Sequence, residues 1–233
     1  MLDEHSRGTV SINIAGVEFR CRILPMRSIA FCLALACAGF CQDAPRPAAD
    51  PVPADPNASG PGLYAIFDTS MGQIVVRLLE DKAPKTIDNF VSLANGVKPS
   101  ADAEGKHMIR KRFYDGMIFH RVIRGFMIQT GDVKGTGDSN CGVDPIPDEI
   151  DPVLRFDAPG RLAMANLGQP NTAACQIFIT VGQAQHLNGT FTIFGIVSSG
   201  QDVADKIAAV PTSNEHPVIP VTLNKVTIER RNH

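Results

Sequence analysis

The sequence lacks tryptophan and has only two tyrosines among its 233 residues, so 12 phenylalanines supply nearly all of its aromatic packing. It also lacks an excess of charge: 22 lysines and arginines stand against 24 aspartates and glutamates, which gives a formal net charge of −2. Proteins that bind nucleic acid or an anionic membrane surface electrostatically carry a basic surface instead. The composition therefore gives no case for either kind of partner.

The N-terminal part of the chain has no apolar run long enough to span a bilayer, which takes about 20 residues. It has Met26-Arg27, followed by the apolar run Ile29–Phe40. A basic residue before about a dozen apolar ones is typical of a secretory signal peptide. We therefore expect residues 26–41 to be a signal peptide and residues 1–25 to be an upstream extension that is not translated. On this hypothesis the protein is exported to the periplasm or the cell envelope.

The end of this segment leaves two kinds of processing open. Ala34-Leu35-Ala36 before Cys37 fits a small-residue signal-peptidase site, and it also resembles a lipoprotein site, in which the cysteine is lipidated. Ala34 stands where the lipoprotein pattern prefers leucine. A lipid on Cys37 is the only membrane contact that we expect. Residues 42–62, which contain six prolines together with alanine and aspartate, predict an extended linker.

Residues 63–233 are long enough for one domain with a core of its own. Short runs of β-branched and aromatic residues alternate there with glycine- and proline-containing turns. Only two segments have helical spacing: the one that Pro84 opens, and Gln201–Ala209. Many short strands with two helices indicate a mainly β fold, either a closed barrel or a sandwich.

The most informative stretch is Phe113–Asp132, in which two apolar runs, Met117–Ile123 and Phe126–Gln129, meet at an Arg-Gly turn. This pattern predicts two short strands joined by a tight connection. Arg121 and Gln129 interrupt the apolar runs. An arginine in a strand is usually a solvated side chain. A cation and an amide within an apolar concavity can, however, orient a peptide-like ligand.

The run from Phe119-His120-Arg121-Val122-Ile123 through Gly125-Phe126-Met127 to Gln129 resembles the signature of the cyclophilin-type peptidyl-prolyl isomerases. The similarity extends, with gaps, from about Leu63 to Ile228. Further motifs of that family follow in the same order: Met164-Ala165-Asn166, Gln176-Ile177-Phe178, Leu187-Asn188-Gly189 and Phe194-Gly195. The resemblance implies a closed barrel of eight antiparallel strands capped by two α-helices.

The resemblance also implies a role for each matching residue. Arg121 would be the catalytic residue, and Gln129 would orient Arg121 or a substrate carbonyl. The substrate groove would be formed by Phe126, Met127, Ala165, Asn166, Gln176, Phe178, His186, Leu187 and Phe191. Two of these depart from the family pattern, since His186 stands where many members have tryptophan and Phe191 where many have histidine.

The activity implied is rotation about X–Pro peptide bonds of proline-containing polypeptides, which would assist the folding of exported proteins. No cofactor is expected, and we expect a monomer. A non-catalytic domain that holds proline-containing segments as a chaperone is the alternative. His120 should point away from Arg121, because side chains alternate along a strand. No second histidine or cysteine lies at ligand spacing from His120, so the sequence predicts no metal site.

Two of the six cysteines, Cys141 and Cys175, lie in the expected domain. By the family's layout, both fall near the outer pocket of the groove. A disulfide across that pocket, which an exported protein could form, and two separate reduced thiols are both left open.

Overall fold

The computed structural model describes residues 10–14, 17–21, 55–102, 106–137 and 141–232. The chain divides into two compact units, Met1–Ala48 and Ala49–His233. The described part of the first unit is an antiparallel hairpin of β1 (Val10–Ile14) and β2 (Val17–Cys21). The predicted signal peptide and most of the predicted linker lie outside the described residues. Those domain boundaries therefore stay predictions.

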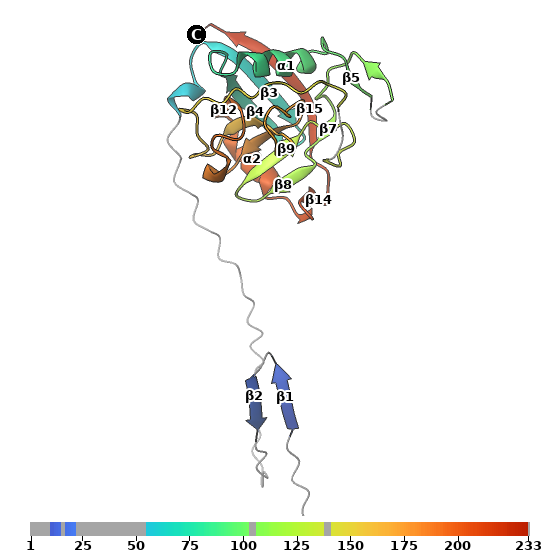
Figure 1. Ribbon diagram of the computed structural model, residues 1–233, viewed down its shortest axis with the longest axis vertical. Helices are drawn as coiled ribbons and strands as arrows, with labels where there is room; N and C mark the ends of the chain where they lie inside the picture. Colours follow the sequence, from blue (N-terminus) through green and yellow to red (C-terminus); the bar gives the residue numbers. More distant parts are fainter. Residues whose placement is uncertain (1–9, 15–16, 22–54, 103–105, 138–140, 233) are drawn as a thin grey trace, which may run out of the picture. The chain divides into compact units, whose positions relative to one another are not determined.

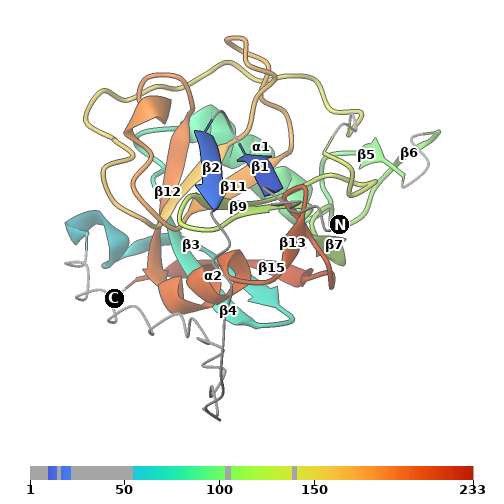
Figure 2. The same cartoon turned by 90° about the horizontal axis from the view of Figure 1, so that it is seen from below.

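The second unit is organised around one sheet of nine strands in the order β7-β15-β3-β4-β12-β10-β11-β9-β8 (Figures 1 and 2). Every neighbouring pair is antiparallel. The strands are β3 (Gly62–Thr69), β4 (Gly72–Leu78), β7 (Met117–Ile118), β8 (Arg121–Ile123), β9 (Met127–Thr130), β10 (Arg161–Met164), β11 (Ile177–Thr180), β12 (Ile193–Ser199) and β15 (Thr222–Arg231).

Shorter elements surround this sheet. Two small hairpins pair β5 (Ser100–Ala101) with β6 (Met108–Ile109) and β13 (Thr212–Ser213) with β14 (His216–Pro217). Two single 3-10 turns are η1 (Pro56–Ala58) and η2 (Gln185–Leu187). The α-helices are α1 (Pro84–Ala94) and α2 (Gln201–Ala208). The prediction of a mainly β domain with two helices is confirmed.

The two edge strands of the sheet, β7 and β8, are consecutive in the chain and are separated only by Phe119 and His120. The sheet must therefore curl strongly to bring its edges this close. The sequence predicted one strand over Met117–Ile123. The structure divides it in two, because β7 pairs with β15 whereas β8 pairs with β9. The closed eight-stranded barrel stays a prediction.

Phenylalanine carries the aromatic packing of the core, as the composition predicted. Pro84 begins α1 at its first turn, where a missing N–H costs nothing, and the buried face of the helix presents Phe90. The Phe90 ring centroid lies 5.2 Å from that of Tyr114 and 5.3 Å from that of Phe194. Helix α1 thereby packs on the main core, and Phe194 connects it to β12.

Candidate active site

Strand register places Arg121, Gln129 and Phe178 in one row across the sheet. Arg121 on β8 lies opposite Gln129 on β9, Gln129 lies opposite Phe178 on β11, and Phe178 lies opposite Ala163 on β10. Directly opposite residues of an antiparallel pair point to the same face, with Cβ atoms about 4.5–5.5 Å apart. Residues from distant parts of the chain are thus brought together on one face.

Alternation along these strands separates two groups of apolar side chains. Val122, Ile128 and Ile179 belong to the main core. Their neighbours on the other face belong to a second cluster, which we call the groove cluster. Its buried members are Met127, Phe156, Ala163, Phe178, Ala184 and Ile193, and its partly buried members are Ile123, Phe126, Leu154, Ala165, Leu187 and Phe191.

Six of the nine predicted substrate-contacting residues lie in the groove cluster: Phe126, Met127, Ala165, Phe178, Leu187 and Phe191. A seventh, His186 of η2, joins through its ring, whose centroid lies 5.3 Å from that of Phe126. The Phe178 ring is stacked on Phe156 and meets Phe191 edge-on at 5.6 Å. Phe178 is buried and Phe126 is only partly buried. The cluster therefore combines one buried ring, Phe178, with one partly buried ring, Phe126.

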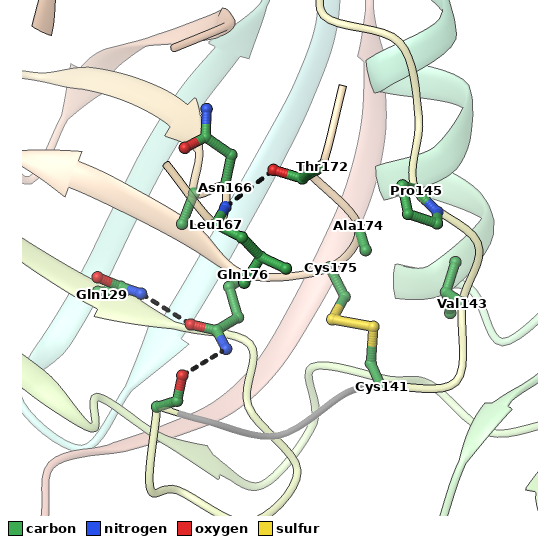
Figure 3. A pocket seen from close by; sticks show the side chains of 12 residues that line it. Gln129, Cys141, Val143, Pro145, Asn166, Leu167, Thr172, Ala174, Cys175 and Gln176 are labelled. Atoms are coloured by element: carbon green, nitrogen blue, oxygen red, sulfur yellow. Dashed lines mark hydrogen bonds between the residues drawn. A yellow bond between two sulfur atoms is a disulfide. The ribbon is translucent and has the colours of Figure 1, made fainter. Parts of the chain in front are cut away.

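A pocket of about 270 Å³ with a mixed polar and apolar lining shares Ala165 with this cluster, and Gln129 also lines it (Figure 3). The Gln129 amide donates from Nε2 to Oε1 of Gln176 at 2.7 Å, and Gln176 donates to the Gly137 carbonyl at 3.2 Å. Asn166, also on the pocket wall, donates from Nδ2 to the Thr190 carbonyl at 3.1 Å. The remaining predicted residues, Asn166 and Gln176, are therefore held in place by hydrogen bonds.

Arg121 has an ion-pair partner that the sequence did not indicate. Its Nε donates to Oε2 of Glu215 at 2.6 Å. The two side chains are 43% and 49% exposed, respectively. The Arg121 side chain is thus partly open to solvent, and its position in β8 is directly opposite Gln129. The Gln129 amide NH₂ group donates to Gln176. That Gln129 orients Arg121 or a substrate carbonyl stays a prediction.

Comparison with known proteins places these motifs in a family. Residues 64–228 match the model of the cyclophilin type peptidyl-prolyl cis-trans isomerase/CLD family. The chain belongs to this family. A peptidyl-prolyl cis-trans isomerase B of Streptomyces anulatus is 45% identical over 173 residues, which cover 72% of this chain and 98% of that protein. A probable peptidyl-prolyl cis-trans isomerase A of Mycobacterium leprae is 46% identical over 70% of this chain and 91% of that protein.

Solved structures agree with this assignment. The crystal structure of a Cryptosporidium parvum cyclophilin type peptidyl-prolyl cis-trans isomerase aligns with this chain at a TM-score of 0.61 and 31% identity. The alignment covers 72% of this chain and 98% of the Cryptosporidium chain. The fold of the chain is therefore cyclophilin-like. The chain is an enzyme, a peptidyl-prolyl cis-trans isomerase. Membership of this family favours catalysis over the purely chaperone-like alternative.

Cys141 and Cys175 form a disulfide in the wall of the pocket that Gln129 and Gln176 line (Figure 3). The sequence left this pairing open. Both residues are almost fully buried, and Cys175 directly precedes Gln176 on the pocket wall. The bond therefore links the loop that follows β9 to the segment that leads into β11. Among the described residues, no group of three metal-binding side chains is present, and no helix is long and apolar enough to cross a membrane.

His120 is 1% exposed and lies in the two-residue gap between β7 and β8. That its side chain points away from Arg121 stays a prediction. Burial lowers the pKa of the His120 imidazole below the ordinary value of 6.5. Desolvation disfavours the imidazolium cation more strongly than the negative charge of Asp132 stabilises it. His216 and Arg121 contribute smaller shifts in the same direction as burial, and the nearby Gln176 side chain acts in the opposite direction. His120 is therefore neutral at pH 7.

The disulfide should stabilise the domain. It closes a loop of 34 residues, and such a cross-link contributes about 3–4 kcal/mol to the free energy of unfolding. We expect a reducing agent to lower the urea midpoint of the wild-type protein. The variant with both Cys141→Ser and Cys175→Ser should start at the lower midpoint and show no response to the reducing agent. Equal midpoints for oxidised and reduced wild type would contradict this.

The buried His120 should make the domain less stable in mild acid. Its pKa is lower in the folded than in the unfolded chain, so the unfolded chain takes up the proton first as the pH falls below about 6.5. Each unit of pKa difference amounts to about 1.4 kcal/mol. We expect the His120→Phe variant to lose less stability between pH 7 and pH 5 than the wild type, as measured by urea denaturation at each pH. Parallel pH profiles of wild type and variant would refute this.

Proposed function

We propose that Arg121 catalyses rotation about the X–Pro bond by donating a hydrogen bond to the prolyl nitrogen while the proline ring rests on the groove cluster. The observation that carries this proposal is the row formed by strand register, in which Arg121 and Phe178 flank Gln129 on one accessible face. Phe126, Met127 and Phe178 would hold the ring, with His186, Leu187 and Phe191 as the surrounding wall.

The chemistry requires no covalent intermediate. Resonance gives the peptide C–N bond a rotation barrier of about 18–20 kcal/mol, and an X–Pro bond isomerises without help in tens to hundreds of seconds. In the twisted state resonance is lost and the nitrogen regains a lone pair. A donor at that nitrogen is therefore bound more tightly in the transition state than in either planar isomer, which is the condition for catalysis. Guanidinium suits this task because it stays charged and presents several donors in fixed directions.

The pocket that Gln129 and Gln176 line would bind the part of the substrate peptide on the N-terminal side of the proline. Gln176 and Asn166 offer amide groups there, and the Met164–Asn166 segment offers backbone groups. The Ala165 N–H already donates to the Gln176 carbonyl at 2.9 Å. A bound peptide would have to pair with other backbone groups of this segment. A second Cryptosporidium parvum cyclophilin structure, 30% identical to this chain with a TM-score of 0.60, was determined in the presence of the dipeptide Ala-Pro. Proline-containing polypeptides are therefore the substrates that we propose here.

We further infer that β7, Phe119-His120 and β8 together take the place of one barrel strand. This segment pairs with β15 at one end and with β9 at the other. Counting the two strands as one reduces nine strands to eight, and the ladder would then close on itself.

The wider role that we propose is folding of exported proteins by a monomeric enzyme, in the periplasm or attached to the cell envelope through a lipid on Cys37. The support is the sequence of residues 26–41 and the proline-rich residues that follow. The disulfide fits an oxidising compartment.

Export makes a prediction about the N terminus of the native protein. Removal of the signal peptide should leave a chain that starts at Cys37 or later, because signal peptidase cuts after small residues such as Ala36. Mass spectrometry of the protein isolated from its own cells measures this. A mass shift of an acyl chain on Cys37 would indicate the lipoprotein form. A peptide from residues 1–25 would contradict the proposed start at Met26.

Arg121→Ala should abolish isomerisation without unfolding the domain. If the guanidinium contributes about 4 kcal/mol to the transition state, turnover falls on the order of a thousandfold. A protease-coupled assay on an X–Pro peptide measures the rate, and urea denaturation checks the fold. The matched control is Arg124→Ala, since Arg124 donates to the Ala209 carbonyl at 2.8 Å, outside the row of Arg121, Gln129 and Phe178. A folded Arg121→Ala protein with wild-type turnover would show that the donor is a different group.

A further inference from the structure

The turn between β13 and β14 is attached to strand β8 at two neighbouring residues. The backbone N–H of Val122 donates to the Glu215 carbonyl at 2.7 Å. The side chain of Arg121 donates from Nε to Oε2 of the same glutamate at 2.6 Å. Strands β8 and β14 lie side by side in Figure 1. The carboxylate is therefore held against the guanidinium by its own backbone.

The backbone at this turn is unfavourable for a glutamate. Asn214 has a φ of 49° and Glu215 a φ of 67°, both in the left-handed region. A two-residue hairpin loop with positive φ at both positions favours Asn-Gly, because glycine has no Cβ to clash with the neighbouring carbonyl. Asn214 fits this preference and Glu215 does not. A glycine at position 215 would relieve the backbone and would remove the carboxylate.

The ion pair restricts Arg121 without blocking it. Guanidinium is planar and has five N–H donors, so fixing the Nε–H bond fixes the plane and leaves the four N–H groups of Nη1 and Nη2 available. Glu215 is the partner that the structure gives the Arg121 side chain among the described residues. A half-exposed arginine has many rotamers in water, and only those that place a terminal amino group at the prolyl nitrogen can catalyse.

We propose that Glu215 is a positioning residue for Arg121: its carboxylate holds the guanidinium plane across the groove so that the Nη groups face the prolyl nitrogen. This rests on the catalytic role proposed above for Arg121. Glu215 itself touches no substrate. Its effect belongs to turnover more than to binding, since the donor acts only once the amide is twisted.

The test compares Glu215→Gly with Asn214→Gly. Both variants replace a left-handed residue of the same turn by glycine, but only Glu215→Gly removes the ion pair. We expect Glu215→Gly to lower kcat about two- to fivefold with KM nearly unchanged, the range for a half-exposed ion pair. Its urea midpoint should equal or exceed that of the wild type. Asn214→Gly should retain wild-type kcat and KM.

Salt gives a second readout that a purely structural role would not affect. Added salt screens an exposed ion pair, so the wild-type kcat should fall between low and high ionic strength. The kcat of Glu215→Gly should be insensitive to salt. Glu215→Gln keeps an oxygen that can accept from Nε and should recover part of the loss, whereas Glu215→Lys, which repels the guanidinium, should show the lowest kcat of the series.

Two results would overturn the proposal. One is a Glu215→Gly protein with kcat equal to that of the wild type or higher, which would mean that the carboxylate is neutral for catalysis or restrains it. The other is the same salt profile for wild type and Glu215→Gly. Arg121→Ala is measured in parallel. If the Arg121→Ala protein keeps its activity, the catalytic role proposed for Arg121 is refuted. If Arg121→Ala is inactive and Glu215→Gly has no effect, only the positioning role proposed for Glu215 is refuted.

Discussion

The two-residue period of the β-strand is the constraint on which the rest of this structure depends. Along β8, β9, β11 and β10, alternate side chains point into the main core, and those between them point to the opposite face. One set of strands therefore builds a core and a binding surface at the same time. A shift of register by one residue would exchange the two faces and would bury Arg121 and Gln129.

Loops that lie far apart in the sequence complete the surface that the strands begin. The segment with η2 brings His186 and Leu187 to Phe126, and the disulfide brings Cys141 to the residue before Gln176. The β13–β14 turn brings Glu215 to Arg121. These contacts are of three different types: ring packing, a covalent bond and an ion pair. The rigid sheet supplies the position, and the loops supply the walls and the orientation of side chains.

Sequence reasoning was most successful where one motif carries both structure and chemistry. The run around Arg121 identified the family and two strands, and it contributes Ile123, Phe126 and Met127 to the groove cluster, because the apolar residues of that run also form the sheet. It was wrong about the single strand over Met117–Ile123, since pairing to two different partners divides it. It missed Glu215 because a lone glutamate in a proline-rich loop gives no local signal. It left the disulfide open because spacing alone does not specify distance.

The sequence by itself determined the family, the mainly β character and the residue types available for catalysis, since these follow from local pattern and ordered motifs. Only the tertiary structure decided which of these residues meet. Gln129 donates to Gln176, Glu215 holds Arg121, and Cys141 reaches Cys175. Such contacts depend on the curl of the sheet and on the path of its loops. They are properties of the whole folded domain, and no short stretch of sequence contains them.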